Sequence, residues 1–83
     1  MQYLLMSRSM TYAQRSVKTL ERAGIAASVI RAPRTAGAKG CGYCAAVSEK
    51  NGKRALEILE KAGMKPEKIF RREPDGTIRE AAL

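Results

Sequence analysis

Histidine and tryptophan are absent from this chain of 83 residues, and cysteine occurs only twice, at Cys41 and Cys44. Without an imidazole, the chain forms neither a Ser-His-Asp triad nor a Cys-His pair. Two thiols are too few for a four-ligand zinc site of nitrogen and sulfur ligands in one chain. The sequence also lacks a carboxylate pair and a phosphate-binding loop. We therefore expect a protein that is not an enzyme and that holds no metal and no resident cofactor.

Long hydrophobic runs are also missing from the sequence. No segment approaches the roughly 20 apolar residues that a membrane span needs. The apolar start of the chain, Met1–Met6, is too short for the hydrophobic region of a signal peptide, and no cleavage-site pattern follows it. We expect a cytoplasmic protein without a membrane partner, whose thiols are reduced at rest.

The charge of the chain is strongly positive. Lysine and arginine number 16 against 8 acidic residues, which gives a net charge of +8. The excess is concentrated in residues 1–40, where Glu21 is the only acid. Such a positive field suits nucleic acid, an anionic small molecule or an acidic protein partner.

Hydrophobic periodicity predicts four strands and two helices in the order β-α-β-β-α-β. The strands are expected at residues 2–6, 26–31, 42–47 and 67–72. The helices are expected from Ser9 to Gly24 and from Ser48 to Gly63, each with a hydroxyl cap at its start and a glycine at its end. The apolar face of the first helix is predicted to hold Met10, Ala13, Val17 and Leu20.

The two helix ends repeat each other, since Leu-Glu-Arg-Ala-Gly-Ile at residues 20–25 matches Leu-Glu-Lys-Ala-Gly-Met at residues 59–64. Two βαβ units in series are typical of the ferredoxin-like α+β sandwich, with two helices on one face of an antiparallel sheet. We expect this domain at residues 1–72. Residues 73–83 are predicted to hold a turn at Pro74-Asp75-Gly76, a short fifth strand at 77–79 and a frayed tail.

The strongest local feature is Cys41, which lies between Gly40 and Gly42 where a loop meets the third predicted strand. Small neighbours leave its sulfur accessible. Nearby cations and the amides at the start of the first helix would favour the thiolate, which is the reactive form of cysteine. The cations close in sequence are Arg31, Arg34 and Lys39. Connectivity also predicts that Ser7 and Ser9 lie at this end of the sheet.

The order of these elements, together with Pro33-Arg34 and Cys41-Gly42, resembles the selenium/sulfur carrier protein-like family over nearly all of residues 2–72. The resemblance implies a cysteine that carries sulfur or selenium as a persulfide or perselenide, received from a donor protein and passed to an acceptor. Cys41 would be that carrier. Arg31 and Arg34 would then stabilise the charged sulfur, and Ser7 and Ser9 would hydrogen-bond it. Cys44 is not part of the family pattern.

Cys41 and Cys44 also spell Cys-x-x-Cys, which leaves a redox or soft-metal protein as an alternative, with Cys44 as a second thiol. An extended chain would separate the two Cα atoms by roughly 10 Å. A disulfide needs less than about 7 Å. The strand and an intrachain disulfide therefore exclude each other, and we favour the strand, with Cys44 and Ala46 on one of its faces.

The uncovered face of the sheet offers a third possibility. Tyr3 and Tyr43 are predicted to lie there, where an RNA-recognition domain stacks bases, and Leu5 and Phe70 are expected beside them. The sequence lacks a Gly-Phe-x-Phe run on the third strand. We therefore favour a homodimer through the open face over a nucleic-acid-binding module.

A basic stripe follows one side of the first helix. It consists of Arg15, Lys18 and Arg22, spaced to lie opposite the apolar positions. The stripe indicates a solvated face, or a docking surface for an acidic partner or for phosphates.

Overall fold

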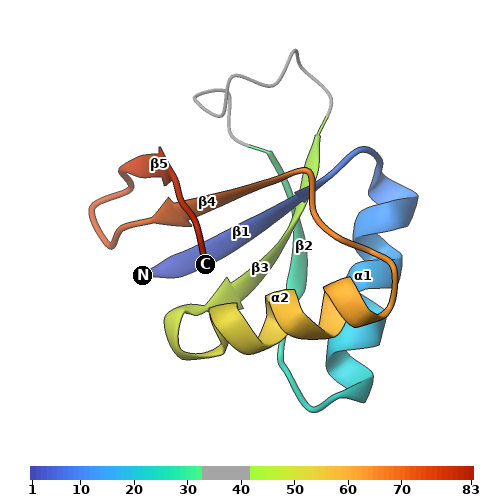
Figure 1. Cartoon of the computed structure of the whole chain (residues 1–83). Helices are drawn as coiled ribbons and strands as arrows, with labels where there is room; N and C mark the ends of the chain where they lie inside the picture. The colour runs from blue at the N-terminus through green and yellow to red at the C-terminus, as the bar shows by residue number, and fades with distance from the viewer. Residues whose placement is uncertain (33–41) are drawn as a thin grey trace.

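A computed structural model describes residues 1–32 and 42–83 of the chain. Two helices cover one face of a five-stranded antiparallel sheet with the order β2-β3-β1-β4-β5 (Figure 1). The strands are β1 (Gln2–Ser7), β2 (Ser28–Arg31), β3 (Tyr43–Ser48), β4 (Lys68–Arg72) and β5 (Ile78–Glu80). The helices are α1 (Met10–Arg22) and α2 (Gly52–Lys61), with a short 3₁₀ turn, η2 (Glu49–Asn51), before α2. The predicted ferredoxin-like α+β sandwich is confirmed, including the short fifth strand.

The two helices begin differently. Ser9 caps α1 as predicted, because its Oγ accepts a hydrogen bond of 3.2 Å from the backbone N–H of Tyr12. Ser48 was expected to cap α2, and that prediction is wrong. Its side chain makes no cap hydrogen bond, and the chain first turns through η2 before α2 begins at Gly52.

The repeated helix ends fold in the same way. Gly24 and Gly63 have positive φ angles of 85° and 73°. The N–H of the next residue returns to the helix in both cases, from Ile25 to the Leu20 carbonyl at 2.9 Å and from Met64 to the Leu59 carbonyl at 2.8 Å. This is the Schellman arrangement, in which a left-handed residue lets the chain satisfy the last carbonyl groups. The sequence repeat is therefore a repeat of backbone structure.

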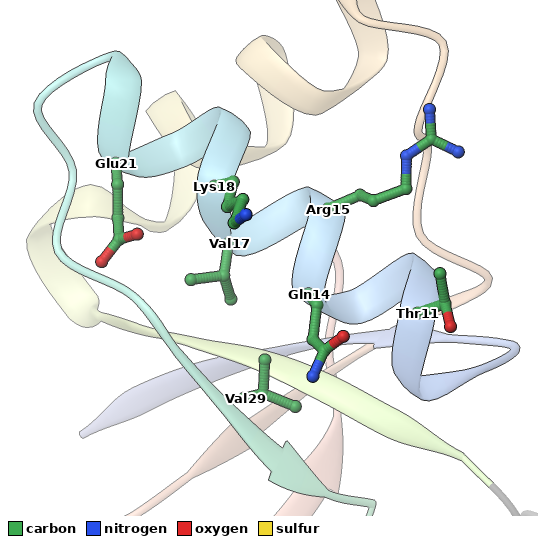
Figure 2. Close-up of a pocket in the computed structure, with 7 residues that line it drawn as sticks. All are labelled: Thr11, Gln14, Arg15, Val17, Lys18, Glu21 and Val29. Atoms are coloured by element: carbon green, nitrogen blue, oxygen red, sulfur yellow. The ribbon is translucent and has the colours of Figure 1, made fainter.

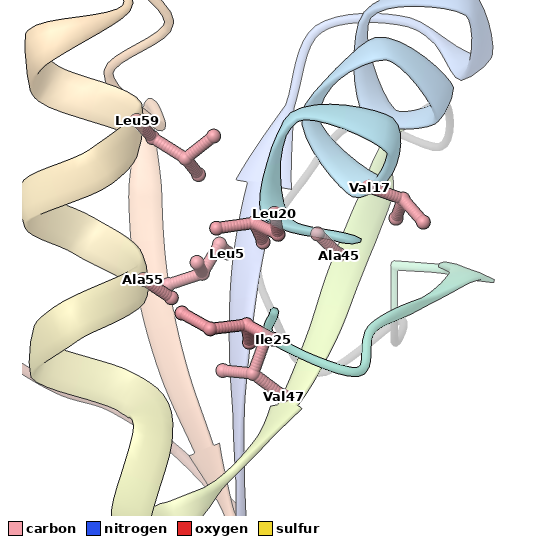
Figure 3. Close-up of a cluster of buried hydrophobic side chains, with 8 residues drawn as sticks. All are labelled: Leu5, Val17, Leu20, Ile25, Ala45, Val47, Ala55 and Leu59. Carbon is pink, nitrogen blue, oxygen red and sulfur yellow. The ribbon is translucent and has the colours of Figure 1, made fainter. Parts of the chain in front are cut away.

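The main core lies between the helices and the sheet (Figure 3). Its buried members are Leu5, Val17, Leu20, Ile25, Ala45, Val47, Ala55 and Leu59. Tyr3 packs against this cluster, so the prediction that Tyr3 and Leu5 lie on the open face is wrong. Tyr43 shares their side, because side chains along β3 alternate and Tyr43 is two residues from Ala45.

A second apolar cluster occupies the opposite face of the sheet. Its buried members are Leu4, Met6, Cys44, Ala46 and Phe70. Phe70 therefore lies where the sequence predicted, and Cys44 shares its face with Ala46. Ile30, Ala32 and Ile78 pack against the cluster. This face is already buried within the chain, so it does not present the exposed apolar surface from which we expected a homodimer.

One predicted member of the helix face lies outside the core. Met10 is 46% exposed, whereas Ala13, Val17 and Leu20 are buried. Met10 is the first residue of α1. Ser16 takes a buried position instead and donates its hydroxyl to the Tyr12 carbonyl at 3.0 Å, which satisfies this buried polar group.

The chain beyond β4 forms a hairpin. The turn is the predicted one, with Gly76 at φ 91° and the Asp75 carboxylate accepting the N–H of Thr77 at 2.9 Å. The backbone of Ala81 still donates to the Ile69 carbonyl at 2.8 Å. The sheet thus continues past residue 72. Within residues 1–32 and 42–83, neither helix is long and apolar enough to cross a membrane.

Candidate functional site

The predicted site lies at one end of the sheet, where β1 leads into α1, where β2 ends and where β3 begins (Figure 1). Ser7 of β1 and Arg31 of β2 both pair with Tyr43 of β3, so these three residues form one row across the sheet. The N–H of Ala32 donates to the Gly42 carbonyl at 2.9 Å and closes the next row. Three predicted site residues, Arg34, Gly40 and Cys41, lie outside the described residues.

The two predicted serines have different environments. Ser7 is buried, with 6% of its surface exposed, and shares its row with Tyr43. Ser9 is half-buried, and its Oγ accepts the N–H of Tyr12 as the cap of α1. The sequence therefore placed both serines correctly at this end of the sheet. The capping bond gives Ser9 a structural role in starting the helix here.

Two arginines reach solvent beside these serines. Arg31, the last residue of β2, is exposed. Arg8 lies between Ser7 and Ser9, and its guanidinium is 3.9 Å from the Glu67 carboxylate and 5.7 Å from the centre of the Tyr12 ring. Its side chain is 74% exposed, so the distant ion pair leaves most of its charge in solvent. Arg8 was not among the predicted site residues, although it lies between the two predicted serines in the sequence.

Gly42 is a glycine for packing reasons. A Cβ atom there would lie 3.1 Å from Ala32 Cβ and 3.3 Å from Met6 Sδ. Those distances are tighter than ordinary van der Waals contact, so a larger residue would require the side chains of Ala32 and Met6 to shift by a few tenths of an ångström.

The second thiol, Cys44, is part of the apolar cluster on the far face of the sheet. It is fully buried, forms no disulfide, and is paired with Met6 and Ile30 on the neighbouring strands. Burial disfavours the thiolate and raises the pKa of Cys44 to about 11. Such a thiol is protonated at neutral pH and has little nucleophilic reactivity.

The described part of the chain offers no cage for a metal ion. Within residues 1–32 and 42–83, no three His, Cys, Asp or Glu side chains gather as potential ligands. The structure thus defines a class of protein. It is a small ferredoxin-like domain with exposed cationic side chains at one end of its sheet, and the strand that begins there, β3, follows shortly after Cys41 in the sequence.

The comparisons identify the family within that class. The chain belongs to the family described as "Putative Se/S carrier protein-like", whose model matches residues 2–71. The match covers β1 to β4 and both helices, and it ends before β5. No curated protein and no solved structure matches the chain.

Proposed function

We propose that this protein is a carrier, rather than an enzyme, that accepts a sulfur or selenium atom on Cys41 and passes it to an acceptor. The observation that supports this most is the position of Cys41 in the sequence. It directly precedes Gly42, at the sheet end where Arg8 and Arg31 are exposed. Membership of a carrier-like family supports the same function. We propose that it acts in the cytoplasm, where thiols are kept reduced.

The transfer requires no external oxidant. The Cys41 thiolate attacks the outer sulfur of a donor persulfide, R–S–SH. A new S–S bond forms to Cys41 while the S–S bond of the donor breaks, and the donor leaves as the thiolate R–S⁻. The outer sulfur moves with its hydrogen and without a net change in oxidation state. An acceptor thiolate repeats the same exchange on Cys41, and a donor selenium atom would move in the same way. Both partners are therefore thiol-bearing proteins or small thiols.

The neighbouring side chains have proposed roles in this exchange. A persulfide is anionic at neutral pH, so Arg31, with Arg34 and the exposed Arg8, would favour the charged forms of the sulfur. Ser7 and Ser9 would act at the same sheet end, Ser7 by hydrogen bonding and Ser9 by holding the start of α1 in place. Gly40 and Gly42 would give a partner close access to the sulfur.

The two cysteines provide a matched pair for the test. The wild type, Cys41→Ala and Cys44→Ala are each incubated with glutathione persulfide and then examined by intact-mass spectrometry. Wild type and Cys44→Ala are expected to gain one sulfur atom, and Cys41→Ala none. A sulfur gain by Cys41→Ala, or no gain by the wild type, would contradict the proposal.

The alternative functions have less structural support. A redox or soft-metal Cys-x-x-Cys site needs two reactive thiols, and burial keeps Cys44 protonated. A nucleic-acid-binding module would need accessible aromatic side chains on the open face, but Tyr3 packs on the helix side and Phe70, on the open face, is buried. We do not retain the homodimer through the open face, because its apolar side chains are buried within the chain.

A further inference from the structure

A groove separates α1 from β2, the strand at one edge of the sheet (Figure 2). Its volume is about 430 Å³, within the range of roughly 300–1,000 Å³ in which proteins hold ligands. Val17 of α1 and Val29 of β2 supply its apolar part, and Gln14 points toward Val29. Lys18 and Arg15 are its cationic lining residues, with the Arg15 guanidinium extending away from Val29, and Glu21 lies toward the end of the helix (Figure 2).

The edge strand beside the groove presents hydrogen-bonding groups outward. Ala32 donates to the Gly42 carbonyl, so these two residues form a hydrogen-bonded pair. In an antiparallel ladder such pairs alternate, which makes Ile30 and Ser28 the next residues that bond to β3. Val29 and Arg31 therefore direct their N–H and C=O groups away from the sheet. In residues 1–32 and 42–83, no other backbone group bonds to them.

We propose that β2 and this groove bind an extended, acidic segment of a partner protein, which adds to the sheet as a further strand. The segment would pair with the outward groups of Val29 and Arg31. Its side chains on the helix side would lie over Val17 and Val29, because alternate residues of a strand share a face. This proposal does not depend on Cys41.

The positive charge around the groove favours an acidic partner. Arg15 and Lys18 are exposed on α1, Arg31 is exposed on β2, and Glu21 is the acid of the groove. Carboxylates on the incoming segment would be attracted to these cations. A second copy of this chain is the less suitable occupant, since each copy carries a net charge of +8 and brings the same cations to the contact.

The probe is a fluorescently labelled heptapeptide, Val-Thr-Glu-Thr-Val-Thr-Glu, in which the alternate positions that share one strand face carry both valine and glutamate. Its affinity is measured by fluorescence anisotropy. The double variant Arg15→Glu/Lys18→Glu is expected to bind about tenfold more weakly. Lys53→Glu/Arg54→Glu is its control, because it makes the same charge change on exposed positions of α2. Binding that both double variants weaken equally would overturn the proposal, and so would the absence of binding to the wild type.

Strand addition itself has a separate test. Hydrogen exchange of the amides of Val29 and Arg31 is expected to slow when the peptide is added, whereas Ile30 is already bonded within the sheet and should not change. Val29→Pro removes the outward N–H together with the valine side chain, so Val29→Thr, which keeps the N–H and the branched shape, is its control. The proline variant should fold yet lose binding, whereas the threonine variant should still bind. Unchanged exchange at both amides would overturn the proposal. Self-association that Val29→Pro abolishes would do so as well, since the occupant would then be a second copy.

Discussion

The ring of Tyr3 lies directly over Gly52, the first residue of α2. A Cβ atom on residue 52 would be 2.6 Å from Tyr3 Cε2 and 3.0 Å from Tyr3 Cγ. This contact holds the start of α2 against β1, and it uses the aromatic side chain that was predicted on the other face of the sheet. The glycine is therefore required by packing, since its φ of −57° suits any residue.

Gly52→Ala is expected to destabilise the protein by about 1–3 kcal/mol, because the new methyl group overlaps a ring held in a packed core. Urea denaturation measures the loss. Lys53→Ala, at the next and exposed position, is the control and should change stability by less than about 0.5 kcal/mol.

The same contact predicts coupling between the two positions. In the background Tyr3→Leu, Gly52→Ala should cost less than in the wild type, because the overlapping ring is gone. Equal costs in the two backgrounds would mean that the ring does not limit residue 52.

The repeated helix ends lead to a second prediction. Gly24→Ala and Gly63→Ala should each cost about 1–2 kcal/mol, because both positions have left-handed backbone conformations that disfavour a Cβ. Nothing lies within 4 Å of the added Cβ in either case, so the cost is one of backbone conformation. Thermal or urea unfolding measures it.

Asparagine variants at the same two positions distinguish a cost in backbone conformation from a cost in packing. Gly24→Asn and Gly63→Asn should be less costly than the alanine variants, since asparagine tolerates the left-handed region better. A large difference between the two sites would show that the helix ends are not equivalent in energy.

Cys44 should make the protein less stable at alkaline pH. Its pKa is about 11 in the folded chain and about 8.5 in the unfolded chain, so the unfolded state loses its proton first. The contribution of the protonated Cys44 thiol to the free energy of unfolding is complete below pH ~8.5 and declines as the pH rises toward 11. We expect the difference in urea stability between wild type and Cys44→Ala to shrink across this interval. A difference that is constant with pH would mean that the thiol is not shielded.

Iodoacetamide labelling gives an independent readout of the two thiols. At neutral pH, the folded wild type should react at one cysteine only, because Cys44 is buried and protonated. Denaturant should expose the second thiol. Peptide mapping identifies the labelled residue, and rapid labelling of Cys44 in the folded protein would contradict the structure.

The arginines at the sheet end should control the reactivity of Cys41. Arg8→Gln/Arg31→Gln is expected to raise the labelling pKa of Cys41 by about 0.5 unit, because it removes two positive charges that favour the thiolate. Lys53→Gln/Arg54→Gln, on exposed positions of α2, is the control with the same change in net charge. If both double variants shift the pKa equally, the effect comes from net charge rather than from these two arginines.

The sequence alone determined the element order, the start of α1 and the C-terminal ends of both helices, because these depend on local properties. Apolar spacing separates helix from strand, Ser9 caps by a bond to a residue three positions away, and Gly24 and Gly63 are needed wherever the backbone turns left-handed. It also placed Ser7, Ser9 and Arg31 at one end of the sheet, since the connectivity of a βαββαβ chain leaves little choice.

Only the tertiary structure decided which face each strand residue takes and what lies opposite it. Alternation with a period of two divides β1 into two sets, but it does not say which set the helices cover, and so Tyr3 and Leu5 were placed on the wrong side. The contact of Tyr3 with Gly52, the burial that raises the pKa of Cys44, and the groove between α1 and β2 all join residues far apart in the chain. They depend on packing between elements, which the local pattern of a sequence does not contain.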